Sequence, residues 1–281
     1  MKKFLKVFIY CTGLASLCLI MQFVASVPVT VFYVMLYSLP YVLAGKPEAI
    51  MSVDIMNIVH DSLLPSYILS VIMTFFAAWI IHAIFGRKFF ERLSFNKASS
   101  FLIALSFIAG SALQMPISFI LSLIESAGVA PDLFEQYSNN MEQLMNNQNL
   151  ILQILAVGIL APLLEEIIFR GLILNQLRNN LPIQAAIIIQ ALLFGIVHLN
   201  VIQGSYAFII GIILGLLVVW YDSLFLPVAF HMGLNLSGVI LSEFGQGISD
   251  MAGIYMLIIS FLLMFACMIV LKHRTKEKPA H

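Results

Sequence analysis

Residues 149–175 read NLILQILAVGILAPLLEEIIFRGLILN, an apolar run that contains two adjacent glutamates and one arginine. A membrane-spanning helix needs about 20 predominantly apolar residues, and this run is long enough to be one. An ionisable side chain inside a membrane helix costs about 3 kcal/mol on insertion scales, so such residues mark candidate functional sites. The run therefore predicts a membrane helix with charged residues that are candidates for a functional site.

The rest of the chain is equally apolar. Of its 281 residues, 61% are hydrophobic and 10% are charged, whereas soluble domains have about 25% charged residues. This composition excludes a soluble enzyme and predicts an all-α, polytopic membrane helical bundle. The net charge of zero, from 14 basic and 14 acidic residues, argues against a nucleic-acid partner. The three cysteines lie in apolar runs without a metal-binding or disulfide spacing.

Apolar runs of the required length predict about eight transmembrane helices. The first apolar stretch continues past Pro28 and Pro40 to about Ala44, and we interpret it as one span followed by an interfacial or tilted continuation. A cleaved signal peptide is the alternative, but the apolar region exceeds the roughly 7–15 residues that such peptides have. The predicted spans are 7–28, 66–85, 100–124, 149–175, 183–199, 205–221, 224–242 and 252–271.

The basic residues predict the orientation, because Lys and Arg concentrate on the cytoplasmic side of a membrane. With both termini cytoplasmic, 13 of the 14 Lys and Arg residues lie inside and Lys46 lies outside. The external segment from Glu125 to Gln148 has four acidic residues and no Lys or Arg. We therefore expect a multi-pass protein of the plasma membrane with both termini in the cytoplasm.

The two glutamates of the fourth predicted span have different surroundings. Glu166 and Arg170 stand at i and i+4, with the acid on the N-terminal side, which is the better order for an ion pair. Glu165 points about 100° away around the helix and has no charged partner one turn on. A lone carboxylate in such a place is a candidate general base. The alternative is that these charges are structural.

Two further polar groups lie inside predicted spans. His198 closes the segment Phe194–His198, and His231 shares one helix face with Asn235 at i and i+4. Imidazole and amide groups can polarise a water molecule, ligate a metal or bind an oxyanion. Each residue taken singly could instead be an interhelical hydrogen bonder. Together with Glu165 they form a hydrolytic constellation without a serine nucleophile.

The three motifs, Glu165-Glu166-x-x-x-Arg170, Phe194-x-x-x-His198 and His231-x-x-x-Asn235, resemble the signature motifs of the CPBP family of intramembrane proteases. This family includes CAAX prenyl endopeptidases of the Rce1 type and bacteriocin-immunity proteins. The resemblance covers about residues 150–240. It divides the chain into a membrane region without motifs (1–148), a catalytic core (149–245), and a last helix with a basic tail (246–281).

The resemblance implies hydrolysis of a peptide bond in a membrane-associated protein or peptide. Glu165 and His198 would activate the attacking water, and His231 and Asn235 would bind the oxyanion or help to hold a metal. Glu166 and Arg170 would position the helix. Zn²⁺ or another divalent metal could be held by Glu165, His198 and His231, and a metal-independent, glutamate-based mechanism is equally open. The chain has no HExxH motif, with which zinc would be easier to argue.

Two other function classes compete with the protease. One is a catalytically silent membrane scaffold that binds a partner protein, and the other is a transporter that uses the buried polar groups as a proton relay. A geometric difficulty also remains, because in straight spans His198 lies deeper than Glu165 and His231. We expect either a kink at Pro162 or a short hairpin formed by the fifth and sixth spans to bring the three residues level.

Overall fold

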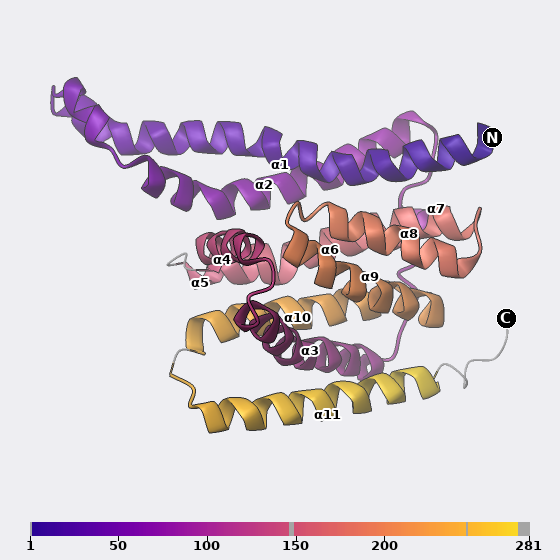
Figure 1. Ribbon diagram of the computed structural model, residues 1–281. Helices are drawn as coiled ribbons and strands as arrows, with labels where there is room; N and C mark the ends of the chain where they lie inside the picture. Colours follow the sequence, from indigo (N-terminus) through magenta and orange to yellow (C-terminus); the bar gives the residue numbers. More distant parts are fainter. Residues whose placement is uncertain (1, 146–148, 246, 275–281) are drawn as a thin grey trace.

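The computed structural model describes residues 2–145, 149–245 and 247–274, and within these ranges every regular element is a helix (Figure 1). Seven helices are long and apolar enough to cross a membrane. They are α1 (Lys2–Leu43), α2 (Ile55–Ile84), α3 (Ser100–Ser126), the continuous run α5 to α7 (Leu150–Arg178), α9 (Val201–Tyr221), α10 (Phe225–Phe244) and α11 (Asp250–Arg274). The predicted all-α polytopic bundle is confirmed.

The fifth predicted span, 183–199, is shorter than expected, so seven of the eight predicted spans have long apolar helices in the described residues. Its helix, α8 (Ile183–Ile196), has 14 residues and is therefore about 21 Å long, less than the roughly 30 Å of a bilayer core. Figure 1 shows that α8 and α9 lie side by side, and that their connection falls short of the end of the bundle where α10 and α11 are joined. From the sequence we expected either a kink or a short hairpin to bring His198 level with Glu165 and His231, and α8 and α9 form such a hairpin.

The remaining elements are short and connect the membrane helices. They are η1 (Pro47–Ser52), η2 (Phe90–Arg92) and the amphipathic surface helix α4 (Pro131–Met145). In Figure 1 the start of α1 and the end of α11 lie at the same end of the bundle, together with the ends of α2 and α7. We call this end the basic end, and the opposite end, at which η1 lies, the far end. The arrangement agrees with two termini on one side of the membrane.

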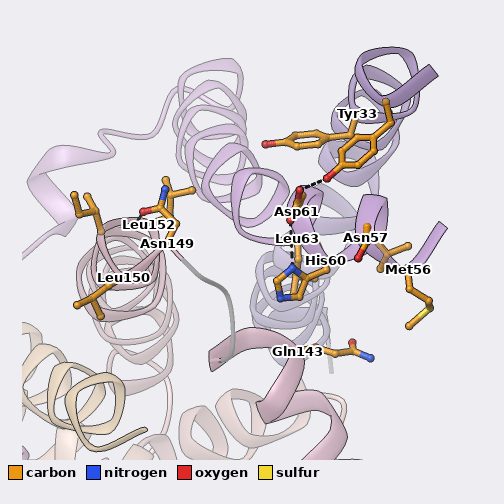
Figure 2. Close-up of a pocket in the computed structure, with 13 residues that line it drawn as sticks. Tyr33, Met56, Asn57, His60, Asp61, Leu63, Gln143, Asn149, Leu150 and Leu152 are labelled. Carbon is orange, nitrogen blue, oxygen red and sulfur yellow. Dashed lines mark hydrogen bonds and ion pairs between the residues drawn. The ribbon is translucent and has the colours of Figure 1, made fainter. Parts of the chain in front are cut away.

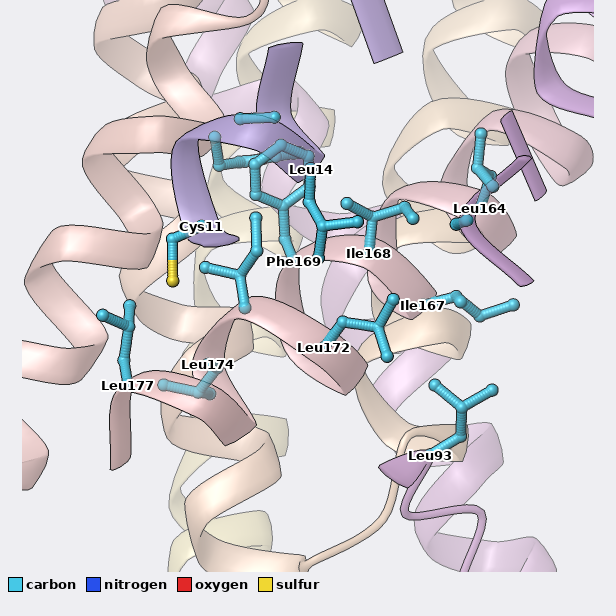
Figure 3. Close-up of a cluster of buried hydrophobic side chains, with 14 of the residues drawn as sticks. Cys11, Leu14, Leu93, Leu164, Ile167, Ile168, Phe169, Leu172, Leu174 and Leu177 are labelled. Carbon is cyan, nitrogen blue, oxygen red and sulfur yellow. The ribbon is translucent and has the colours of Figure 1, made fainter. Parts of the chain in front are cut away.

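Helix α1 continues without a break through Pro28 and Pro40, so the predicted span and its apolar continuation are one helix of 42 residues. It packs along α2 (Figure 1). Its first half also packs on the centre of the molecule, where Cys11 and Leu14 join the buried cluster around Ile168, Phe169 and Leu172 (Figure 3). The N-terminal region thus forms part of the wall around residues 161–174.

Helices α3 and α10 approach each other very closely, and this contact holds the helix that carries His231. A Cβ atom added to Gly110 would lie 1.9 Å from the carbonyl oxygen of Phe230, and one added to Gly233 would lie 2.2 Å from that of Phe107. Two hydroxyls on α3, those of Ser106 and Ser111, donate to backbone carbonyls of α10. Small residues that let helix backbones touch are a recognised means of helix association in membranes.

This contact yields a first prediction. The substitution Gly110→Ala should destabilise the protein by about 1–3 kcal/mol, because a methyl group cannot fit against the Phe230 carbonyl without moving α10. The measurement is the midpoint of thermal unfolding in detergent. Gly253→Ala in α11 is the matched control, since nothing lies within 4 Å of its added Cβ. Equal midpoints for the two variants would contradict the close packing.

Candidate active site

Glu166 and Arg170 form the ion pair that their spacing predicts. The Nη1 atom of Arg170 donates to Oε1 of Glu166 at 2.8 Å, and both side chains are fully buried. The guanidinium group also lies over the ring of Phe194, with its carbon 4.2 Å from the ring centroid. The arginine is therefore neutralised on one side and stacked on an aromatic face on another, as a buried cation requires.

Glu166 has a second partner that the sequence did not indicate. Its Oε1 atom lies 2.9 Å from Nδ1 of His231, on α10. With the carboxylate accepting from Nδ1–H, the imidazole is held in one orientation and its Nε2 atom is directed elsewhere. Arg170, Glu166 and His231 thus form one buried chain of contacts that links residues 166–170 to α10.

Glu165 faces the opposite nitrogen of the same imidazole. Its Oε2 atom lies 3.7 Å from Nε2 of His231, and its Oε1 atom accepts from the hydroxyl of Tyr67 at 3.5 Å. The Glu165 side chain is 20% exposed, whereas that of Glu166 is fully buried. The two adjacent carboxylates therefore differ as predicted: one is fixed by short contacts, and the other has long contacts and access to small molecules.

His198 lies at the tip of the α8–α9 hairpin. Its Nδ1 donates to the carbonyl of Phe194 at 2.7 Å, which leaves Nε2 as the available nitrogen. Its electrostatic neighbours include Glu165 and His231, so the hairpin brings the three predicted residues together. The tip is tight because the hairpin helices touch at Gly195, where an added Cβ would lie 2.6 Å from the carbonyl oxygen of Gly204.

Phe194 is the common neighbour of the other groups. Its ring centroid lies 4.9 Å from that of His198 and 5.7 Å from that of His231, both edge to face. It also stacks against Arg170 and contacts Phe169. One fully buried ring therefore sets the relative positions of the two histidines and the arginine, a role that the motif spacing alone does not reveal.

Asn235 makes its hydrogen bond to the backbone. Its Nδ2 atom donates to the carbonyl oxygen of Val157 at 2.9 Å, which connects α10 to the helical turn η3 (Ile154–Leu160). This contact suits an interhelical connection better than an oxyanion donor.

The contact of Asn235 leads to a second prediction. Asn235→Ala should lower the midpoint of thermal unfolding, because the Val157 carbonyl loses its donor, at a cost of about 1–3 kcal/mol. Turnover per folded molecule should change little. An oxyanion donor would behave in the opposite way, with a loss of about 10²–10³-fold in turnover and an unchanged midpoint. Measuring both quantities on one preparation separates the two roles.

The helix that carries the glutamates is not a regular α-helix. Residues 154–160 (η3) and 166–174 (η4, Glu166–Leu174) have π-helical hydrogen bonding, on either side of the α-helical segment α6 (Ala161–Glu165) that contains Pro162. Wide turns of this kind are rare and occur frequently at functional sites, since they change the direction of side chains relative to a regular helix. The predicted kink region is therefore a pair of π-helical segments.

Tyr67 is a residue near the site that the sequence interpretation missed. It lies on α2, far from the three motifs, and contacts Glu165. The sequence does contain a pattern that singles out this part of α2. Four residues with a side-chain hydroxyl recur at every fourth position of this apolar helix and are buried, and Tyr67 directly follows the second of them. These residues are Ser62, Ser66, Ser70 and Thr74.

The candidate metal ligands do not form a three-ligand centre. Glu165, His198 and His231 provide the right kinds of donor, and each imidazole has its Nδ1 held so that Nε2 is available. However, no group of three His, Cys, Asp or Glu side chains in the described ranges lies close enough to hold a metal ion. The donor types suit a metal, and their spacing does not.

The family of the central region follows from comparison with known proteins. The family model described as type II CAAX prenyl endopeptidase Rce1-like matches residues 147–237. This segment is similar to the Rce1-like family. Neither the curated proteins nor the solved structures gave a match to the chain. The predicted resemblance to the CPBP family is thus confirmed for this segment.

The matched segment includes all six predicted site residues, from Glu165 to Asn235. It does not include Tyr67 or helix α1, although both regions lie against it. The predicted catalytic core of 149–245 overlaps the matched segment closely, and the division of the whole chain into three regions stays a prediction. The protein is an integral multi-pass membrane protein with seven long apolar helices.

Proposed function

We propose that this protein is an intramembrane endopeptidase that uses Glu165 as the general base. The observation that carries the proposal is the contrast between two neighbouring carboxylates. Glu166 is fully buried and bound to Arg170 and His231, whereas Glu165 is partly accessible and faces Nε2 of His231 at 3.7 Å. A general base needs access to water. The atom at which it accepts the proton must also be free of short contacts to other groups.

In the proposed reaction Glu165 takes a proton from a water molecule as its oxygen attacks the carbonyl carbon of the scissile peptide bond. His198, with Nδ1 committed to the Phe194 carbonyl, orients this water through Nε2. The tetrahedral intermediate collapses with cleavage of the carbon–nitrogen bond, and Glu165 returns the proton to the leaving amine. The products are a carboxylic acid and an amine.

His231 would stabilise the negative oxygen of the tetrahedral intermediate. The carboxylate of Glu166, at 2.9 Å from Nδ1, fixes the orientation of the imidazole and keeps its other nitrogen directed toward Glu165. Arg170 and Phe194 hold Glu166 and the ring in place. Tyr67 would support Glu165 from the opposite side, and Asn235 would hold α10 against η3.

The substrate is a membrane-associated protein or peptide. Prenylated CAAX proteins fit the name of the family model, and unprenylated peptides, such as bacteriocins or membrane-anchored signals, fit the same chemistry. Purified protein in detergent, incubated with matched peptides with and without a prenyl group, distinguishes the two. The proposal of proteolysis fails if folded wild-type protein cleaves no member of such a set or of a broad peptide library.

A third prediction concerns metal. Because Glu165, His198 and His231 are near one another but do not form a group close enough to hold a metal ion, wild-type cleavage should survive exhaustive chelation in protein shown by elemental analysis to be metal-free. His231→Ala should then leave the metal content unchanged and lower turnover. Loss of activity on chelation, restored by zinc, together with loss of bound zinc in His231→Ala, would instead establish a metalloprotease.

A further inference from the structure

A large cavity opens at the far end of the bundle, and Glu165 and Glu166 are not among the residues that line it. Its volume is about 1010 Å³, and its lining comes from the second half of α1, the start of α2, and the segments around α4 and α5 (Leu150–Gln153). Figure 2 shows polar side chains of its lining. They are Tyr33, Asn57, His60, Asp61, Gln143 and Asn149.

Asp61 gives this cavity a negative charge. Its carboxylate accepts from the hydroxyl of Tyr37, on α1, and lies 3.3 Å from Nδ1 of His60, yet 43% of its side chain remains exposed (Figure 2). Among the described residues no Lys or Arg lines the cavity. The segment 125–145, which includes α4, adds four acidic residues and no basic one. A carboxylate can accept several hydrogen bonds, so this position suits a cationic group.

The other polar side chains suit a peptide backbone. Asn57 and Gln143 carry amide groups, each of which has both a donor and an acceptor, as a peptide unit does, whereas Asn149 accepts at its side-chain oxygen from the backbone N–H of Leu152. Apolar side chains such as Leu63 and Leu152 lie between them. A cavity with amides, aliphatic side chains and one carboxylate matches an extended peptide with a basic side chain better than a purely apolar chain.

The cavity is also within reach of the proposed catalytic base. Asp61 and Tyr67 lie on the same helix, six residues or about 9 Å apart along its axis, and Tyr67 contacts Glu165. An extended peptide covers about 3.3 Å per residue. A substrate whose scissile bond lies at Glu165 therefore reaches the level of Asp61 with a residue about three positions away, and up to about five where its path also passes around α2, because six residues turn a helix by about 240°.

We propose that this cavity is a substrate subsite in which Asp61 binds a Lys or Arg side chain located roughly three to five residues from the scissile bond. The inference rests on the proposed endopeptidase function and adds a substrate preference to it. An ammonium group of a lipid would present the same chemistry to Asp61, and the experiment below separates the two sources.

The test compares peptides that differ at one position by Lys, norleucine or Glu. Norleucine keeps the length of the Lys side chain and removes its charge. In lipid-free micelles wild-type protein should cleave the Lys peptide with a kcat/KM about tenfold above that of the norleucine peptide. Asp61→Asn should abolish this preference, because the amide keeps the shape of the carboxylate and removes its charge. An unchanged preference in Asp61→Asn would overturn the proposal.

A control variant separates the subsite from a general acidic field. Glu135→Gln removes an exposed charge on α4 outside the cavity and should retain the preference for Lys. Loss of the preference in Glu135→Gln to the same extent as in Asp61→Asn would show a general acidic field and overturn the subsite.

The source of the cation and the dependence on catalysis are tested on the Glu165→Gln variant. Its affinity for the labelled Lys peptide, measured by fluorescence anisotropy, should fall about tenfold when Asp61→Asn is added. Vesicles with phosphatidylethanolamine should not compete with the peptide for this variant. If they displace the Lys peptide, the site binds a lipid amine and the proposal fails. If wild type cleaves nothing while Asp61-dependent binding persists, the proposed function falls and the subsite stands.

Discussion

Glu165→Gln should reduce turnover by about 10³-fold while the folded yield stays near that of wild type. The substitution removes the proton acceptor and keeps the shape of the side chain, and positioned acid–base groups contribute about 10²–10⁴-fold to rate. The side chain is partly exposed, and its two contacts, to His231 and Tyr67, are long, so little stability depends on its charge. The measurements are kcat on a cleaved peptide and the recovery of monodisperse protein.

The matched control for this result is Glu135→Gln, which makes the same chemical change at an exposed position of α4 and should leave kcat unchanged. Peptide binding by Glu165→Gln should remain close to that of wild type, because the lost interaction acts on the transition state. A variant that keeps more than about one tenth of the wild-type turnover would remove Glu165 from the role of general base.

Glu166→Gln should have its main effect on folding. Glu166 and Arg170 are both fully buried, and removing one member of a buried ion pair costs about 3–5 kcal/mol, because the other charge is left uncompensated. The same substitution weakens the contact to Nδ1 of His231. We expect a much lower yield of folded protein and a lower midpoint of thermal unfolding, measured beside Glu165→Gln in the same detergent.

A double substitution separates the structural role of Glu166 from its effect on His231. Replacing both members of the pair, as Glu166→Gln with Arg170→Met, removes the unpaired charge and should recover much of the yield, as apolar replacement of buried ion pairs often does. Turnover should remain low, because His231 still lacks its carboxylate partner. Equal yields of Glu165→Gln and Glu166→Gln would contradict this division of roles.

The sequence was sufficient for features that depend on composition and on short helical spacing. Long apolar runs require helices in a bilayer, so the all-α membrane bundle followed directly. The pair Glu166 and Arg170 was predictable because residues four apart on a helix are neighbours whatever surrounds them. The different exposure of Glu165 and Glu166 followed from their angular separation of about 100°.

The tertiary structure decided everything that depends on distant segments meeting. The second partner of Glu166, His231, lies 65 residues away, and the partner of Glu165 on α2, Tyr67, lies 98 residues away. The π-helical segments on either side of α6 are features that hydrophobic periodicity does not report. The short α8–α9 hairpin places His198 inside the bundle only because glycines at positions 195 and 204 let two backbones touch. The motifs in the sequence therefore identified the residue types at the site. The packing of the helices decided which of these side chains lie near one another.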